Sequence, residues 1–240
     1  MNLTVGVLAL QGGFSEHLDL LRNAVDHLSS TEVYSTTNFV LTEVRTPDQL
    51  AQCNALIIPG GESTAISFVA AQSGLLEPLR DFVKVQKRPT WGTCAGLILL
   101  SDEANATKKG GQELIGGLSV RVHRNHFGRQ IESFESDLDL PFLQSESDLV
   151  PFSGVFIRAP VVEEVLSNNN DLRSPVEVLA KLPGRVNKMK SGLSQANTKD
   201  DAGDIIAVRQ GNILGTSFHP ELTKDARIHV WWLKQILNQQ

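Results

Sequence analysis

The residues best suited to covalent chemistry lie in a short glycine-flanked segment, Gly92-Thr93-Cys94-Ala95-Gly96. An extended run ending at Trp91 precedes this segment, and the apolar run Leu97–Leu100 follows it. A strand, a sharp turn and a helix in this order present the central side chain to a cleft, and the start of the helix favours a thiolate. The pattern predicts that Cys94 is a nucleophile and that the N–H of Ala95 stabilises an oxyanion. The alternative is a packing cysteine, because free cysteines are among the most buried residues.

A thiol nucleophile needs a base, and the segment Ser217–Glu221 offers a histidine together with a carboxylate. His219 and Glu221 are two positions apart, so in an extended segment both side chains leave the backbone on the same side. The carboxylate then fixes one imidazole nitrogen while the other nitrogen faces the thiol. The alternative is an ordinary surface loop, because there are five other histidines, at positions 17, 27, 123, 126 and 229. His17 and His27 fall in a helical pattern, where we expect them to be solvated or to pack.

A glycine-rich run, Pro59-Gly60-Gly61-Glu62-Ser63-Thr64, follows the apolar stretch Ala55–Ile58. Paired glycines let backbone N–H groups approach a ligand closely, so the N–H of Gly61 is a candidate partner for that of Ala95 in an oxyanion hole. A phosphate cradle is the alternative, although the run lacks the lysine of a phosphate-binding loop. Ligands of open α/β sheets bind at the carboxyl ends of the strands, so we expect Gln11 and Gly12 near the same rim.

Two arginine-bearing runs supply fixed cations: Arg124–Gln130 and Phe156–Pro160. A guanidinium binds a substrate carboxylate through two parallel N–H bonds, which makes Arg124, Arg129 and Arg158 candidates for that role. The alternative for each arginine is a surface salt bridge.

The composition limits the class of protein. The chain has 240 residues, a formal charge of -5 and 41% hydrophobic residues, which suits one large domain spanning residues 1–240. Mild acidity argues against nucleic acid as a partner, and no apolar stretch is long enough to span a membrane. With only two cysteines and no signal-like start, we expect a reducing, cytoplasmic location. We expect Cys53 to be a packing residue, and no Cys/His cluster has the spacing of a metal site.

The order of the elements indicates the fold. In the first half, buried strands at 3–10, 39–44, 55–58 and 88–91 alternate with helical patterns at 18–28, 75–85 and from Leu97 onward, which predicts a parallel α/β sheet. A capping box at Thr46–Gln49 predicts a short helix. The second half has short strands at 118–122, 155–158, 176–179, 205–208 and 213–217, a hairpin turn at 210–212 and a closing helix at 227–237. Two polar stretches, 133–153 and 181–204, interrupt this half as surface excursions.

Taken together, the motifs resemble a known family. The order of the GGES run, the Gly-x-Cys-x-Gly segment and His219-Pro220-Glu221 resembles the class I, triad-type glutamine amidotransferases. Gln11-Gly12, Arg124–Gln130 with Ser133-Phe134, and Phe156–Pro160 are similar to the glutaminase subunits of pyridoxal 5'-phosphate synthase. The two polar excursions are longer than the compact pattern of those subunits.

The resemblance implies a flavodoxin-like α/β core and the hydrolysis of L-glutamine to L-glutamate and ammonia. It implies that Cys94 is the nucleophile, His219 the acid and base, and Glu221 the residue that orients His219. It further implies an oxyanion hole from Gly61 and Ala95, and glutamine contacts from Gly61, Glu62, Ser63, Arg124, Ile157 and Arg158.

The resemblance also implies a partner. A synthase subunit would receive the ammonia, and glutaminase activity would be negligible without it. The chain itself would carry no cofactor, neither pyridoxal phosphate nor a metal. Two other functions remain open: a stand-alone γ-glutamyl hydrolase or cysteine peptidase of the same fold, and a non-catalytic partner protein.

Overall fold

The computed structural model describes residues 2–105, 112–124, 133–143, 150–166, 173–182 and 203–238. The first half of the chain contains β1 (Asn2–Leu8), α1 (Phe14–Ser29), β2 (Asn38–Val44), α2 (Pro47–Ala51), β3 (Ala55–Ile58), α3 (Ser63–Gln72), α4 (Leu76–Arg80), the π-helical turn η1 (Asp81–Val85), β4 (Thr90–Thr93) and α5 (Ala95–Leu100). The second half contains β5 (Ser101–Asn105), β6 (Leu118–His123), β7 (Ser133–Leu138), the 3-10 turn η2 (Pro141–Leu143), β8 (Phe152–Ile157), β9 (Val161–Val165), β10 (Glu177–Leu182), β11 (Asp204–Gln210), β12 (Ile213–Thr216), the 3-10 turn η3 (Pro220–Leu222) and α6 (Arg227–Leu237).

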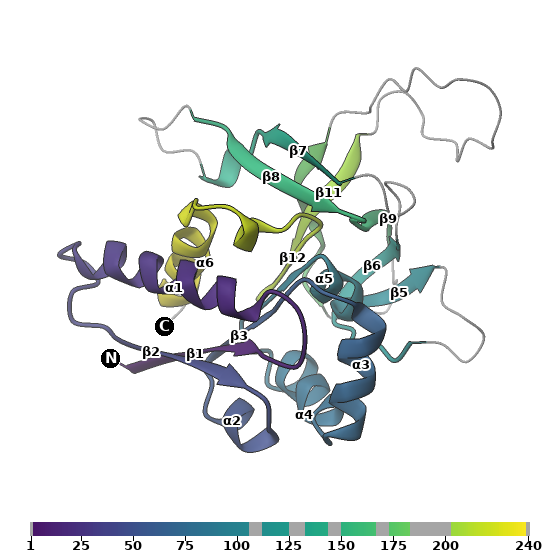
Figure 1. Cartoon of the computed structure of the whole chain (residues 1–240), viewed down its shortest axis with the longest axis horizontal. Coiled ribbons are helices and arrows are strands. Elements are labelled where there is room, and N and C mark those ends of the chain that lie inside the picture. Colours follow the sequence, from purple (N-terminus) through teal and green to yellow (C-terminus); the bar gives the residue numbers. More distant parts are fainter. Residues whose placement is uncertain are drawn as a thin grey trace.

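Both halves contribute to one ten-stranded sheet with the order β2-β1-β3-β4-β12-β11-β9-β6-β5, and β10 pairs with β11 at the side of this path. The strands from β2 to β12 run parallel, whereas β11 is antiparallel to β12, β9 and β10. The predicted α/β class, with a parallel centre and added antiparallel strands, is confirmed (Figure 1). A single domain over residues 1–240 stays a prediction.

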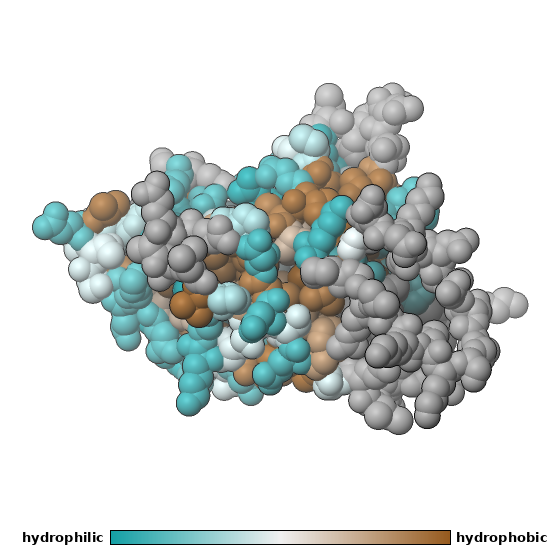
Figure 2. Space-filling model, turned by 90° about the horizontal axis from the view of Figure 1, so that it is seen from above, coloured by the Kyte–Doolittle hydropathy of each residue, from teal (hydrophilic) through white to brown (hydrophobic). Residues whose placement is uncertain are grey.

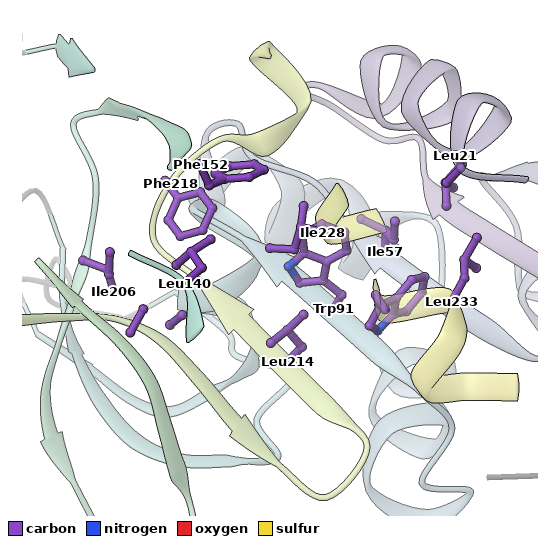
Figure 3. Close-up of a cluster of buried hydrophobic side chains, with 14 of the residues drawn as sticks. Leu21, Ile57, Trp91, Leu140, Phe152, Ile206, Leu214, Phe218, Ile228 and Leu233 are labelled. Carbon is purple, nitrogen blue, oxygen red and sulfur yellow. The ribbon is translucent and has the colours of Figure 1, made fainter. Parts of the chain in front are cut away.

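The sheet is buried on both faces, which explains the nearly continuous apolar runs of its strands. Successive side chains of a strand point to opposite faces, so Ala55 and Ile57 of β3 join one hydrophobic cluster while Leu56 and Ile58 join the other. The first cluster lies beneath α1 and α6, and Figure 3 shows Leu21, Trp91 and Leu233 among its members. The second cluster lies beneath α3, α4 and α5. The central strands are therefore packed on both faces, by α1 and α6 on one side and by α3, α4 and α5 on the other.

Two helix predictions have different outcomes. The capping box is confirmed: the N–H of Gln49 donates to Thr46 Oγ1 at 3.3 Å, and the N–H of Thr46 donates to Gln49 Oε1 at 3.1 Å. The single helix predicted at 75–85 is only partly correct, because α4 is α-helical from Leu76 to Arg80 and the chain continues as the π-helical turn η1.

The first part of the polar stretch 133–153 is regular structure that the sequence analysis did not predict. Ser133–Leu138 is strand β7, which pairs antiparallel with β8 as a separate two-stranded sheet. Its acidic residues point outward, while Leu138 at its end is buried. The second stretch, 181–204, begins inside β10 and ends at the start of β11, and its residues 183–202 lie outside the described residues.

In the part of the chain that the structure describes, no helix combines the length and apolar character needed to cross a membrane. Figure 2 shows apolar side chains toward the middle of the view, with hydrophilic side chains beside them.

Candidate active site

Cys94 lies on a sharp turn between the end of β4 and the start of α5. Its backbone angles are φ 46° and ψ -97°, a conformation that residues with a side chain rarely adopt. Two hydrogen bonds hold the turn: the N–H of Cys94 donates to the carbonyl of Thr216 at 2.8 Å, and its carbonyl accepts from the N–H of Ile98 at 3.2 Å. The turn thus presents the thiol at the carboxyl end of the sheet, as the sequence pattern predicts.

The two flanking glycines serve close packing. A Cβ on Gly96 would lie 2.1 Å from the carbonyl oxygen of Ile58, and a Cβ on Gly92 would lie 2.4 Å from the carbonyl carbon of Gly96. Neither glycine has a positive φ, so the strained conformation belongs to Cys94 itself. The glycines therefore allow α5 to pack directly on the ends of β3 and β4, and this packing holds the turn of Cys94 in place.

His219 and Glu221 follow β12, the strand that pairs in parallel with β4. The N–H of His219 donates to the carbonyl of Val155 in β8 at 2.8 Å, and its Nδ1–H donates to Glu221 Oε1 at 2.7 Å. The predicted extended segment is wrong in detail, because Pro220–Leu222 forms a 3-10 turn. This turn brings the carboxylate under the imidazole.

The charges of these three side chains are coupled. Burial on its own lowers the pKa of His219, but the charge and hydrogen bond of Cys94, followed by those of Glu221, outweigh burial and raise this pKa to about 10. Burial likewise raises the pKa of Glu221, yet His17 and His219 together lower it. The arrangement therefore favours an imidazolium at His219, held between Cys94 and the carboxylate of Glu221.

The loop after β3 closes against the histidine, and β3 pairs in parallel with β4, the strand that leads to Cys94. A Cβ on Gly60 would lie 2.3 Å from His219 Cε1, so only a glycine fits there. Gly61 lies against Gln11, whose Oε1 accepts a 2.7 Å hydrogen bond from the N–H of Glu62. The ends of β1, β3, β4 and β12 therefore meet at one rim.

The predicted glutamine contacts fall into two groups. Next to Gly61, Glu62 caps α3 by accepting from the N–H groups of Thr64 and Ala65 at 3.1 and 2.6 Å. Arg124 Nη2 lies 3.8 Å from Glu62 Oε1 and donates to Thr64 Oγ1 at 3.3 Å. The hydroxyl of Ser63 donates to Gln112 Oε1 at 2.9 Å.

The second group lies at the end of β8, the strand in which the carbonyl of Val155 accepts a hydrogen bond from the N–H of His219. Ile157 is half-buried in the β7–β8 ladder, and the exposed Arg158 follows it with a φ of 47°. Residues 125–130 of the first arginine run lie outside the described residues.

Comparisons with known proteins agree with this geometry. The model of the SNO glutamine amidotransferase family matches residues 7–238. The chain belongs to the SNO glutamine amidotransferase family. An Arabidopsis thaliana protein named probable pyridoxal 5'-phosphate synthase subunit PDX2 is 48% identical over 97% of this chain and 85% of its own length. A Saccharomyces cerevisiae protein named probable pyridoxal 5'-phosphate synthase subunit SNO3 is 40% identical over 99% of this chain and 97% of its own.

A solved structure shares the fold of this glutamine amidotransferase family member. It is described as the crystal structure of a glutamine amidotransferase, and it superposes with a TM-score of 0.70 at 38% identity. The match covers 97% of this chain and 98% of the solved one.

The glutamine amidotransferase site also contains a residue that the sequence analysis assigned elsewhere. His17 of α1 is fully buried, and its Nε2 lies 3.3 Å from Glu221 Oε2. The expectation that it packs is correct, whereas its contact with Glu221 was not foreseen. The sequence does contain a sign of this contact, because His17 shares the apolar face of α1 with Leu21, Ala24 and Leu28. A polar residue on a buried face needs a hydrogen-bond partner.

The second cysteine, Cys53, lies apart from this site, just before β3. Cys53 is buried and donates from Sγ to the carbonyl of Gln49 at 3.3 Å, and burial raises the pKa of its thiol to about 11, although Arg88 opposes that shift. It is the packing residue that the sequence predicts. Within the described ranges, no group of three or more His, Cys, Asp and Glu side chains is arranged to hold a metal ion.

Proposed function

We propose that this protein is the glutaminase subunit of a pyridoxal 5'-phosphate synthase. It hydrolyses L-glutamine to L-glutamate and ammonia, and the ammonia passes to a synthase subunit that builds the pyridoxal ring. The observation that carries the proposal is the succession of Cys94, His219 and Glu221 at one rim of a glutamine amidotransferase fold. The names of the plant and yeast relatives support the pathway.

The chemistry follows from the geometry. The Cys94 thiolate attacks the side-chain amide carbon of glutamine, a C–S bond forms, and the carbonyl electron pair moves onto oxygen. The N–H groups of Gly61 and Ala95 stabilise this oxyanion. The imidazolium of His219 gives its Nε2 proton to the amide nitrogen as the C–N bond breaks and ammonia leaves. Glu221 keeps the imidazole in the required orientation through Nδ1.

Water completes the reaction. The neutral His219 ring takes a proton from a water molecule, which attacks the thioester carbon. The C–S bond then breaks, and Cys94 leaves as a thiolate beside the imidazolium. The sum is glutamine plus water to glutamate plus ammonia.

The glutamine itself is held by residues on the two sides of the thiol. Gly61, Glu62, Ser63 and Arg124 bind from the α3 side, and Ile157 and Arg158 bind from the end of β8. The two arginines supply positive charge for the α-carboxylate, and Glu62 supplies negative charge for the α-ammonium. Both cysteines are free thiols, which supports a reducing, cytoplasmic location for the reaction.

Glutamine turnover with and without a synthase subunit tests the proposal. We expect ammonia release only when the partner is present, and a loss of about a thousandfold or more in Cys94→Ala. Cys53→Ala is the matched control, because it removes the other buried thiol far from the rim, and it should retain turnover. Labelling of Cys94 by a glutamine-analogue electrophile should be blocked by glutamine.

Two outcomes would overturn the assignment. Cleavage of γ-glutamyl peptides without hydrolysis of free glutamine would identify a γ-glutamyl hydrolase. Full support of pyridoxal phosphate synthesis from glutamine by Cys94→Ala would identify a non-catalytic partner.

A further inference from the structure

A second buried polar cluster lies directly behind the Cys94–His219–Glu221 succession. It consists of His17 from α1, Thr93 from the end of β4, and His229 from α6, all with 0% exposure. His17 Nε2 lies 3.3 Å from Glu221 Oε2 and 3.2 Å from Thr93 Oγ1, and its Nδ1 lies 3.0 Å from His229 Nε2. Helices from opposite ends of the chain thus converge on the carboxylate that orients His219.

We propose that His17 is a positioning residue: its Nε2–H binds the second oxygen of Glu221, and this contact fixes the carboxylate on which the orientation of His219 depends. The proposal rests on the function proposed above. It concerns a residue that does not touch glutamine and acts only through Glu221.

The second carboxylate oxygen of Glu221 is buried and needs a hydrogen-bond donor. Glu221 Oε1 accepts from His219, but among the described residues no donor forms a hydrogen bond to Oε2, and the residue is only 4% exposed; the nearest nitrogen, His17 Nε2 at 3.3 Å, is hydrogen-bonded to Thr93 Oγ1 in the structure. A buried carboxylate oxygen without a donor is costly, by about 1–3 kcal/mol. His17 Nε2–H has two acceptors within reach, and the charged oxygen of Glu221 is a stronger acceptor than the hydroxyl of Thr93.

The tautomers of the two histidines are consistent with this role. If His17 carries its proton on Nε2, its Nδ1 is an acceptor, and the Nε2–H of His229 is the donor 3.0 Å away. His229 then locks the tautomer of His17, as an outer partner locks the ring of a ligand histidine. Burial lowers the pKa of His17 and lowers that of His229 well below its usual value, so both rings are neutral near neutral pH.

The surroundings of His17 contain few other charges. Trp91 of β4 packs edge-on against it, with ring centroids 5.6 Å apart, and also against His229 at 4.8 Å. The groups that act on the charge of His17 are Glu221, His219 and Glu16 of its own helix. With His17 removed, Glu221 loses its nearest donor at Oε2, so its carboxylate protonates at a higher pH and turns more freely.

The test compares His17→Leu, which removes the N–H, with His17→Gln, whose amide NH₂ reaches about the same place. With the synthase subunit present, His17→Leu should lower kcat by about tenfold to a hundredfold, the effect of losing an outer partner. KM for glutamine should change less than about twofold, because His17 is remote from the substrate. The acid limb of the pH profile of kcat should move to higher pH, and His17→Gln should recover most of the loss. His27→Leu, an exposed position on the same helix, is the matched control and should match wild type.

A second test uses the wild-type protein, so its result does not depend on whether a variant folds. Nitrogen NMR of ¹⁵N-histidine-labelled protein should show His17 neutral and protonated on Nε2 near neutral pH. A His17 protonated on Nδ1 alone would overturn the proposal, because Nε2 would then have no proton to donate. A kcat of His17→Leu equal to that of wild type would overturn it as well. If wild type itself releases no ammonia with the synthase subunit, the proposed function fails instead, and the NMR result still reports the contact.

Discussion

The strained backbone of Cys94 is held by its neighbours and not by its own residue type. A side-chain residue at φ 46° and ψ -97° costs roughly 1–3 kcal/mol, which the surrounding packing must supply. Gly92 and Gly96 allow that packing, and Gly60 allows His219 to lie against the loop after β3. At this site three glycines fix the positions of the two side chains that carry the proposed chemistry.

Gly60→Ala tests the last of these contacts. The new Cβ would lie 2.3 Å from Cε1 and 2.5 Å from Nδ1 of His219, so the ring must move away from Glu221 or from Cys94. A displacement of about 1 Å costs about a hundredfold in rate, and we expect a loss of kcat of that size with the fold retained. Steady-state kinetics and a thermal melt measure the two quantities. Gly74→Ala is the control: nothing lies within 4 Å of its Cβ, so it strains only a backbone with φ +70°. Equal activity in the two variants would contradict the prediction.

Among single residues, sequence reasoning identified Cys94, His219 and Glu221 as neighbours because each occurs in a motif with its own chemical logic. It did not identify the role of His17, whose partner Glu221 is more than two hundred positions away in η3. Helical periodicity places His17 on the buried face, yet it cannot say which buried group lies opposite. Only the packing of α1 against α6 and η3 decides that.

At the scale of elements, α3 begins with an unusual cap. Glu62 accepts two backbone hydrogen bonds from the first turn of the helix, and these bonds, with Arg124, lower its pKa against the opposing effect of burial. The same carboxylate is a proposed contact for glutamine. A residue in both roles couples the start of α3 to the substrate.

Substitution of Glu62 separates the two roles. Glu62→Ala should lower the free energy of unfolding by about 1 kcal/mol, the usual loss on removing a cap, as measured by urea denaturation. Glu62→Gln keeps an acceptor oxygen and should lose less. If Glu62 also binds glutamine, both variants should raise KM. A normal KM in Glu62→Ala would limit the residue to capping.

The elements that the sequence analysis did not predict share a physical cause. Helix α3 is apolar or small around its whole circumference, so it shows little helical periodicity. Strand β7 is rich in acidic and serine residues, which are typical of loops, and it becomes a strand because β8 lies beside it. Strands β5 and β9 are short and partly exposed, and sheet pairing stabilises them. In these elements tertiary contacts outweigh the local pattern.

At the scale of the whole molecule, the buried histidines make stability depend on pH. The pKa values of His17 and His229 are lowered in the folded state, so below pH 6.5 the unfolded chain binds more protons than the folded one. Their contribution is fully present above that pH and is lost as the pH falls. The pKa of His219 is raised to about 10, so its contribution is present below pH 6.5 and is lost as the pH rises through about 10.

Urea unfolding as a function of pH measures this balance. From about pH 6.5 down to about pH 5, each neutral buried histidine should reduce the free energy of unfolding by up to about 1.4 kcal/mol per pH unit. His229→Gln keeps a donor for His17 but cannot titrate, so its stability should fall less steeply with acid. Parallel curves for wild type and His229→Gln would show that His229 does not titrate on unfolding.

Strand β12 lies between β4 and β11, although about half of the chain separates it from β4 in sequence. During synthesis on the ribosome, the edge of β4 that pairs with β12 therefore stays open until β12 has been made. A nascent chain halted before residue 213 carries a thiol without its imidazole, along with an unpaired strand edge that invites aggregation. The reactive centre is thus complete only after β12 and the segment that carries His219 have been synthesised.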